Sequence, residues 1–110
     1  MEGEGFRDRT PDFNQVGVAI YGVSYDVPAD NRAWSEMMGF DFPLLSDPQH
    51  ELGRAMGVER EPDDRLFGIP LRVTFLIDPE GVIRWTYRVP REETSTHADL
   101  ALQTVRELIE

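Results

Sequence analysis

The residue with the clearest capacity for chemistry is Arg72, which stands at the start of an apolar run over residues 73–77. A guanidinium stays charged and presents its N–H donors in a fixed fork, which suits a carboxylate or another anion. An arginine that is only solvated could lie anywhere on an acidic surface, whereas Arg72 adjoins a strand whose other residues belong in a core. The sequence therefore indicates either a structural ion pair at Arg72 or a binding site for an anion.

Few other residues offer chemistry. The chain contains no cysteine, so its own residues cannot form a disulfide, a thiolate zinc site, an iron–sulfur cluster or a thiol nucleophile. No glycine-rich phosphate loop, serine nucleophile elbow or pair of catalytic carboxylates is recognisable. His50 and His97 lie on different predicted helices, with no carboxylate at the spacing of a metal motif. We therefore predict no metal and no cofactor. Acidic residues such as Asp63 and Asp64 fit a solvated surface better than a cation-binding loop.

The composition is that of one small globular domain with strong negative charge. The 110 residues are 40% hydrophobic and 29% charged, and the formal net charge is −10, with arginine as the only basic residue besides histidine. Such charge disfavours nucleic acid and anionic membranes, whose binding depends on clustered positive side chains. No apolar run approaches the ~20 residues that cross a bilayer, and the N-terminus lacks the basic and apolar pattern of a signal peptide. We expect a cytoplasmic protein.

The first half of the chain alternates helical and apolar segments. Residues 2–14 carry apolar side chains at helical spacing, and Pro11 predicts that this helix ends or bends there. Residues 16–24 are apolar at nearly every position, which is typical of an interior strand covered on both faces. Pro28 suits the first turn of a helix that Gly39 stops. The expected inner face of that helix is Ala33, Trp34, Met37 and Met38.

A short apolar piece, residues 42–46, precedes a third helix. Asp47 and Pro48 are residues that open helices, and Gly57 is one that ends them. The expected inner face of this helix is Leu52, Ala55 and Met56. Residues 59–68 are charged and aperiodic, which predicts a surface loop.

The last third of the chain reads as a hairpin and a helix. Residues 71–77 and 82–89 are rich in β-branched and aromatic side chains, and the Asp-Pro-Glu-Gly sequence between them predicts an antiparallel hairpin. Residues 94–110 form an amphipathic helix with Ser95 or Thr96 as its cap. The expected inner face is Leu100, Ala101, Thr104, Val105 and Leu108. The alternation of helices and strands predicts an α/β layered domain with the hairpin at one side of the sheet.

Four segments carry a resemblance to a known family: EGEGFRD at 2–8, GVAIYGVSYD at 17–26, FPLLSDPQHELGRAMGV at 42–58 and LRVTFLIDPEGVIRWTYRV at 71–89. Together they resemble the peroxiredoxins, the alkyl hydroperoxide reductase and thiol-specific antioxidant family, and most of all the bacterioferritin comigratory protein and one-cysteine-type branch. The resemblance covers essentially the whole chain. It implies a thioredoxin-like fold with a three-layer α/β/α arrangement, here a single partial domain over residues 1–110 that lacks the N-terminal strands.

In that family, a peroxidatic cysteine in a P-x-x-x-[ST]-x-x-C motif reduces hydrogen peroxide or organic hydroperoxides. The glutamate and the F-R-D segment that follow the motif are matched here by Glu2 and by residues 6–8. By that register the cysteine would fall just before Met1, so the resemblance implies that the chain begins inside the catalytic helix. Thioredoxin or another thiol reductant is the implied partner of the full-length family member.

Arg72 occupies the place of the family's arginine, which lowers the pKa of the cysteine and binds the peroxide oxygens. The resemblance further implies that Glu2 pairs with Arg72 and aims it. Arg72 and Glu2 are thus the candidate catalytic residues of a remnant pocket. Neither can replace the missing nucleophile, so the resemblance predicts a thiol peroxidase domain that is inactive as this cysteine-free chain. Whether the chain acts as an enzyme is left open.

The missing part of the family's fold includes the central strand between residues 16–24 and 71–77. These two strands can pair with each other, accept a strand from elsewhere, or leave ladder groups unpaired. We expect the first arrangement or a homodimer. An alternative function is a non-catalytic thioredoxin-fold module that binds or dimerises through the exposed sheet edge. A third reading is a remnant without selected activity, which would be marginally stable.

Overall fold

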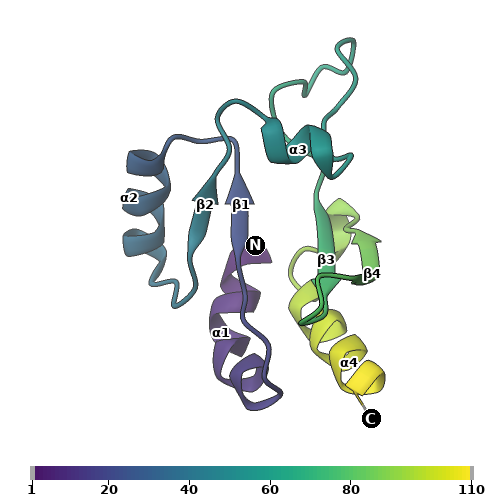
Figure 1. Cartoon of the computed structure of the whole chain (residues 1–110). Coiled ribbons are helices and arrows are strands. Elements are labelled where there is room, and N and C mark those ends of the chain that lie inside the picture. The colour runs from purple at the N-terminus through teal and green to yellow at the C-terminus, as the bar shows by residue number, and fades with distance from the viewer. Residues whose placement is uncertain (1, 110) are drawn as a thin grey trace.

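In a computed structural model, which describes residues 2 to 109, helices alternate with short strands along the chain (Figure 1). The elements are α1 (Glu2–Gln15), β1 (Gly22–Ser24), α2 (Pro28–Met38), β2 (Leu44–Ser46), α3 (Glu51–Ala55), β3 (Val73–Ile77), β4 (Ile83–Arg88), the 3-10 turn η1 (Arg91–Glu93) and α4 (His97–Ile109). This mixture confirms the predicted α/β class. No helix in the described range is long and apolar enough to span a membrane.

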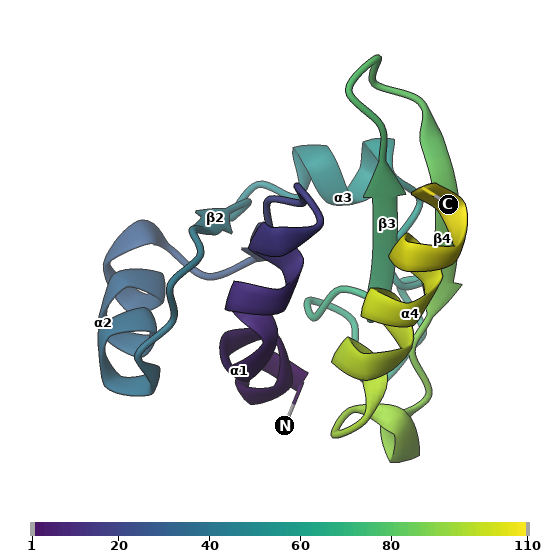
Figure 2. The ribbon, with the colours of Figure 1, turned by 90° about the horizontal axis from the view of Figure 1, so that it is seen from below.

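Helix α1 continues through Pro11 to Gln15, so of the two expected effects of this proline, an end or a bend, the helix does not show the end. A proline inside a helix removes one backbone hydrogen bond and crowds the carbonyl four residues earlier. Packing outweighs this penalty because Phe13, two residues after the proline, is only 2% exposed and joins a buried cluster with three residues of α4. Figure 2 shows α1 and α4 side by side, and this contact forms the core of the molecule.

The strands form two separate sheets of two strands each within the described residues. β1 pairs in parallel with β2, with Gly22 opposite Leu44 and Ser24 opposite Ser46. β3 pairs with β4 in the predicted antiparallel hairpin, whose turn is held by Asp78, since its side chain accepts hydrogen bonds from the backbone of the turn. β1 and β3 do not pair with each other, so our expectation that these strands close the gap is wrong.

The predicted strand over residues 16–24 is shortened to β1 because its first part has no strand beside it. A strand is defined by its ladder, and residues 16–21 find no neighbouring strand in the described chain. Val16, Val18 and Ile20 nevertheless pack against the core cluster, so their apolar character is used for packing rather than for a ladder. Instead of an interior strand, β1 is a strand with one partner.

Helix α2 has the predicted bounds and ends at Gly39, whose φ of 67° is left-handed. Its predicted inner face is wrong for Ala33 and Met37, which are exposed, whereas Trp34 and Met38 are half-buried. The buried residue of the helix is Asn31, which was not predicted to face inward. The Asn31 amide accepts a hydrogen bond from the Ser24 hydroxyl at 2.8 Å and donates to the Ser46 hydroxyl at 2.9 Å. α2 is therefore attached to β1 and β2 through a polar side chain.

Helix α3 is shorter than predicted and begins at Glu51. The Asp47 carboxylate accepts hydrogen bonds from the backbone N–H groups of Leu52 and Gly53, so it stabilises the start of the helix from outside it. The buried residue is Gly53, because the Tyr25 ring occupies the space of a side chain at that position. The predicted inward residues Leu52 and Ala55 are exposed, which corrects that inner face.

The C-terminal third follows the predictions closely. Residues 59–68 form no helix or strand, and helix α4 begins directly after Thr96. Its buried residues are His97, Ala98, Ala101, Leu102 and Val105. Leu108, which was expected to face inward, is exposed near the end of the helix. His97 is the unexpected member, since it is the most deeply buried large side chain described.

Candidate active site

Arg72 lies immediately before β3, and its backbone is held from two sides. Its carbonyl accepts a hydrogen bond from the Val89 N–H at 2.9 Å, and the preceding Leu71 donates to the Val58 carbonyl at 2.8 Å. The Arg72 side chain is 56% exposed. A firmly placed backbone with an accessible guanidinium suits a residue that meets a ligand at the surface.

The structure brings Arg72 and Glu2 together, as the resemblance predicted. Arg72 Nη1 lies 3.8 Å from Glu2 Oε2, within the range of an ion pair but too long for a direct hydrogen bond. The Glu2 side chain is only 25% exposed and belongs to the first turn of α1. The pair therefore joins the N-terminal turn of α1 to the start of β3.

The electrostatics of the pair follow from burial. Burial raises the pKa of the Glu2 carboxyl above its usual range, and the Arg72 guanidinium acts in the opposite direction. Among the described residues, Glu2 is the one ion-pair partner of Arg72, and no hydrogen bond occupies the guanidinium. Arg72 thus has N–H donors available for a second anion.

Beside Arg72, the same strand carries a second polar contact that sequence reasoning missed. Alternate residues of a strand share a face, so Thr74 lies on the side of Arg72. Thr74 Oγ1 lies 2.7 Å from His97 Nε2 at the start of α4. The spacing of His97, Ala101 and Val105, four residues apart, is the signal that could have placed this histidine on the inner face of α4.

His97 is enclosed by aromatic rings. The centroids of Phe6, Trp85 and Tyr87 lie 5.8, 6.2 and 5.5 Å from the imidazole centroid. Its Nδ1 is buried and has no hydrogen-bond partner among the described residues. Burial lowers the pKa of His97, and the Glu93 carboxylate opposes that shift. The contact between His97 and Thr74 therefore joins α4 to β3, two residues after Arg72.

The F-R-D segment plays a structural part in this chain. Arg7 Nη1 donates a hydrogen bond at 2.9 Å to the carbonyl of Met38, the last residue of α2, and Arg7 Nε donates to Asp8 at 3.0 Å. Arg7 therefore ties α1 to α2 rather than joining Arg72.

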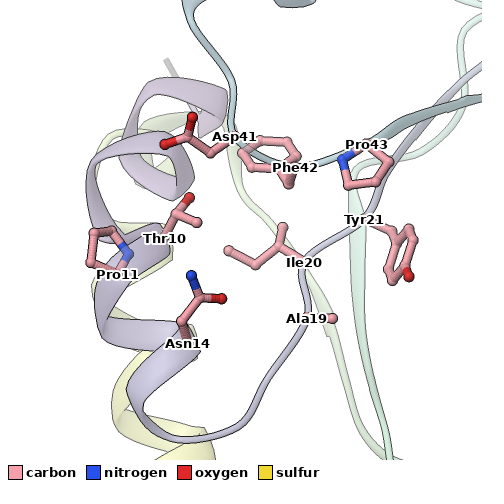
Figure 3. Close-up of a pocket in the computed structure, with 9 residues that line it drawn as sticks. All are labelled: Thr10, Pro11, Asn14, Ala19, Ile20, Tyr21, Asp41, Phe42 and Pro43. Atoms are coloured by element: carbon pink, nitrogen blue, oxygen red, sulfur yellow. The ribbon is translucent and has the colours of Figure 1, made fainter.

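A hollow of about 340 Å³ lies between the second half of α1 and the segment that leads into β1 (Figure 3). Its lining residues are Thr10, Pro11, Asn14, Ala19, Ile20, Tyr21, Asp41, Phe42 and Pro43. Neither Arg72 nor Glu2 belongs to this lining, and no histidine or basic residue does. The hollow is therefore not the candidate site.

Comparison with known proteins connects this geometry to a family. A sequence model described as the AhpC/TSA family matches residues 1–86. The chain belongs to the AhpC/TSA family. The peroxiredoxin Bcp of Xanthomonas campestris pv. campestris is 34% identical over 108 residues, which is 96% of this AhpC/TSA chain and 66% of that protein. Alkyl hydroperoxide reductase E of Mycobacterium bovis is 36% identical over 86 residues, 76% of this chain and 54% of that protein.

Solved structures of the same family share the fold of this AhpC/TSA chain. The bacterioferritin comigratory protein of Xanthomonas campestris, studied for alkyl peroxide reduction, matches with a TM-score of 0.87 and 33% identity over 99% of this chain and 69% of that chain. The peroxidoxin BcpB of Mycobacterium tuberculosis matches with a TM-score of 0.83 and 31% identity over 96% and 68%. The predicted thioredoxin-like peroxiredoxin fold is thereby confirmed. The chain spans about half to two thirds of the length of its curated relatives.

Proposed function

We propose that Arg72 and Glu2 are the anion-binding part of a peroxiredoxin-type thiol peroxidase site whose cysteine is not among these 110 residues. The observation that supports this proposal is the approach of Arg72, in the R-V-T-F-L-I-D segment, to the first turn of α1 in a member of the AhpC/TSA family. As the chain contains no thiol, we expect the isolated chain to consume no peroxide.

The chemistry of Arg72 in such a site follows from its fixed charge. A thiolate sulfur attacks one peroxide oxygen, so that an S–O bond forms, the O–O bond breaks and the second oxygen leaves with the electron pair and takes up a proton. The product is a sulfenic acid together with water or an alcohol. The Arg72 guanidinium favours the thiolate over the thiol and stabilises the charge that develops on the leaving oxygen. Glu2 positions the guanidinium.

The proposal extends to the partner and the compartment. A sulfenic acid must be returned to the thiol by a reductant, for which we propose thioredoxin or another thiol donor in the cytoplasm. The test compares peroxide consumption, with dithiothreitol or thioredoxin, by this chain and by the product of the same gene expressed with any codons that precede Met1. Activity is expected only when those codons encode a P-x-x-x-[ST]-x-x-C motif.

The role of Arg72 is then tested in the active product. Arg72→Met should lower the rate of peroxide reduction about 100-fold, which is the usual effect of losing one charge-stabilising donor. Arg84→Met is the matched control, because Arg84 is also 56% exposed and pairs with Asp78 at 3.6 Å. Full activity in the Arg72 variant, or the lack of any upstream cysteine motif, would refute the proposal.

A second candidate function is a non-catalytic binding or dimerisation module. It is favoured by the combination of a chain without a thiol and two strands, β1 and β3, that each have one partner. Peroxide assays on the product that includes the upstream codons separate the two candidates, since a module of this kind consumes no peroxide with either reductant. Sedimentation of that product should show the association that a binding or dimerisation module requires.

A further inference from the structure

The first turn of α4 contacts both elements that carry the Arg72–Glu2 pair. Helix α1, which carries Glu2, packs mainly against α4 (Figure 2). Strand β3, which begins directly after Arg72, is joined to α4 by the contact of 2.7 Å between Thr74 Oγ1 and His97 Nε2. Because α1 and β3 both rest on α4, the separation of Glu2 from Arg72 depends on the first turn of this helix.

The residues that touch His97 stand one structural repeat away from the pair on both elements. Residues four apart share a face of a helix, so Phe6 lies on the same side of α1 as Glu2. Alternate residues of an extended segment share a face, so Thr74 lies on the side of Arg72. The His97 ring meets both, because its centroid is 5.8 Å from that of Phe6 and its Nε2 contacts Thr74. The imidazole thus lies between the two elements, one repeat inward from the ion pair.

One repeat further inward, the same three elements meet again as the apolar core. Leu76, two residues after Thr74, packs against the buried cluster, whose members are Phe13, Ala101, Leu102 and Val105. The members from α4 continue the face that His97 begins, since Ala101 and Val105 follow it at intervals of four residues. The layer of His97 therefore connects the charged pair at the surface to the most deeply buried part of the molecule.

Helix α1 also approaches the first turn of α4 closely at Gly5. A Cβ atom at this glycine would lie 3.2 Å from the Cβ of Ala98 and 4.0 Å from the carbonyl oxygen of Ser95. Ala98 directly follows His97 in the chain. The spacing of α1 and α4 near the ion pair is therefore set by close contact of the two backbones, which leaves little room for movement.

The environment of His97 suits a supporting residue and not a reacting one. Its side chain is fully buried, and its Nδ1 has no hydrogen-bond partner among the residues that the structure describes. The rings of Trp85 and Tyr87 from β4 stack on the imidazole, with centroids 6.2 and 5.5 Å away. An imidazole enclosed in this way does not meet a ligand at the surface, whereas its contacts to α1 and β3 are in place.

We propose that His97 is a positioning residue that holds Arg72 and Glu2 at ion-pair distance. It does so by fixing the start of β3 through Thr74 and the first turns of α1 through Phe6. This inference rests on the proposed function only for its effect on peroxide reduction. The hold on the ion pair is a property of the 110 residues and is measured without peroxide.

The test measures the interaction of Arg72 with Glu2 by NMR titration of the Glu2 side-chain carboxyl carbon. The Arg72 guanidinium opposes the upward effect of burial on the pKa of Glu2, so Arg72→Met should raise this pKa further. In a chain that also carries His97→Leu, Arg72→Met should leave the pKa of Glu2 unchanged, because the guanidinium no longer lies beside the carboxylate. Each comparison is made within one background, so a change in the burial of Glu2 itself cancels.

Three further variants separate positioning from packing. His97→Gln carries an amide that can bond Thr74 in place of the imidazole Nε2, and it does not titrate, so it should retain the parent's response to Arg72→Met. Thr74→Val removes the same contact from the side of β3 and should lose the response, as His97→Leu does. Tyr87→Phe is the matched control, because it removes a hydroxyl that donates to Glu93 at 2.6 Å and keeps the ring beside His97. It should retain the response.

The same variants have an expected effect on activity in the longer product with an upstream cysteine motif. His97→Leu and Thr74→Val should lower the rate of peroxide reduction, by up to the roughly 100-fold expected for Arg72→Met. His97→Gln and Tyr87→Phe should keep the parent's rate.

Three outcomes of the titration would overturn the inference. The first is a parent chain whose Glu2 pKa does not respond to Arg72→Met, since there would be no pair to hold. The second is a full response in folded His97→Leu and Thr74→Val chains, which would show that the backbone bonds around Arg72 place the guanidinium by themselves. The third is loss of the response in Tyr87→Phe as well, which would indicate a general loosening of α4 on the hairpin. A longer product without peroxidase activity refutes the proposed function instead and leaves the titration result intact.

Discussion

The β3–β4 hairpin rests on an apolar helix, whereas the β1–β2 pair is attached to its helix by a polar side chain. Helix α4 buries Ala101, Leu102 and Val105 in the cluster that includes Phe13, and Leu76 of β3 packs against that cluster. On the other side of the molecule, the buried residue of α2 is Asn31, which bonds to β1 and β2.

This difference between the two sheets reflects what each needs in order to form. A hairpin is built from neighbouring residues and requires only its own turn, whereas a parallel pair depends on elements distant in the chain. Val23 and Leu45, which lie opposite each other in β1 and β2, are each 45% exposed. With three residue pairs against five in the hairpin, the β1–β2 pair is the shorter of the two, and it is joined to its helix by the hydrogen bonds of Asn31.

The largest effect is expected from Phe13→Ala, which would break the better-packed region. Removing a phenylalanine that is 2% exposed loses its apolar burial and leaves a cavity, which should lower the free energy of unfolding by about 3–5 kcal/mol. Urea unfolding, followed by the fluorescence of Trp85 beside the cluster, measures this loss.

The matched control for that variant is Met37→Ala. Met37 is 74% exposed on α2, so its truncation should change the free energy of unfolding by less than about 0.5 kcal/mol. Equal losses in the two variants would contradict the assignment of the core to the α1–α4 contact.

A smaller and more local effect is expected from Asn31→Ala. The substitution leaves the hydroxyls of Ser24 and Ser46 without their amide partner, at a cost of about 1–3 kcal/mol. Amide exchange should accelerate in β1 and β2 and stay unchanged in β3 and β4. Asn14→Ala, at an exposed position of α1, is the control and should leave both sheets unchanged. Uniform acceleration in both sheets would show that they unfold as one unit.

Local patterns predicted the hairpin and the existence and position of α2 and α4, because these depend on residues close in sequence. The buried face of α2 was not predictable from periodicity, since Asn31 is buried only through hydrogen bonds to strands that follow or precede it at a distance. The prediction of a strand over residues 16–24 was wrong for a related reason. Its apolar composition indicates a strand with two neighbours, but composition carries no information on whether both neighbours are present.

In the candidate site, too, a contact that rests on a family motif was predicted, and a contact between distant residues outside any motif was not. The approach of Arg72 to Glu2 was expected from the family resemblance, and its geometry is present in the structure. The contact between Thr74 and His97 was missed, because the two residues lie 23 positions apart and neither forms a motif. The catalytic role of the Arg72–Glu2 pair stays a prediction.

The smallest expected effect is a pH dependence of the free energy of unfolding, which arises from His97 on the hairpin side of the molecule. Its folded-state pKa is lowered by burial, so the unfolded chain binds the proton more readily. Stability contributed by the neutral imidazole is therefore fully present above the unfolded value of about 6.5 and is lost as the pH falls from there through the folded pKa, with a slope of at most about 1.4 kcal/mol per pH unit. Glu93 on η1 is the charged group that opposes this loss, and Thr74 and Tyr87 face the imidazole without charge.

Urea unfolding at a series of pH values measures this effect. In His97→Gln, the free energy of unfolding should fall less steeply with decreasing pH than in the parent. His50→Gln, which removes the other imidazole and keeps His97, should retain the fall seen in the parent. A parent and a His97 variant with the same pH profile would show that the buried imidazole does not couple protonation to the packing of α4 on the hairpin.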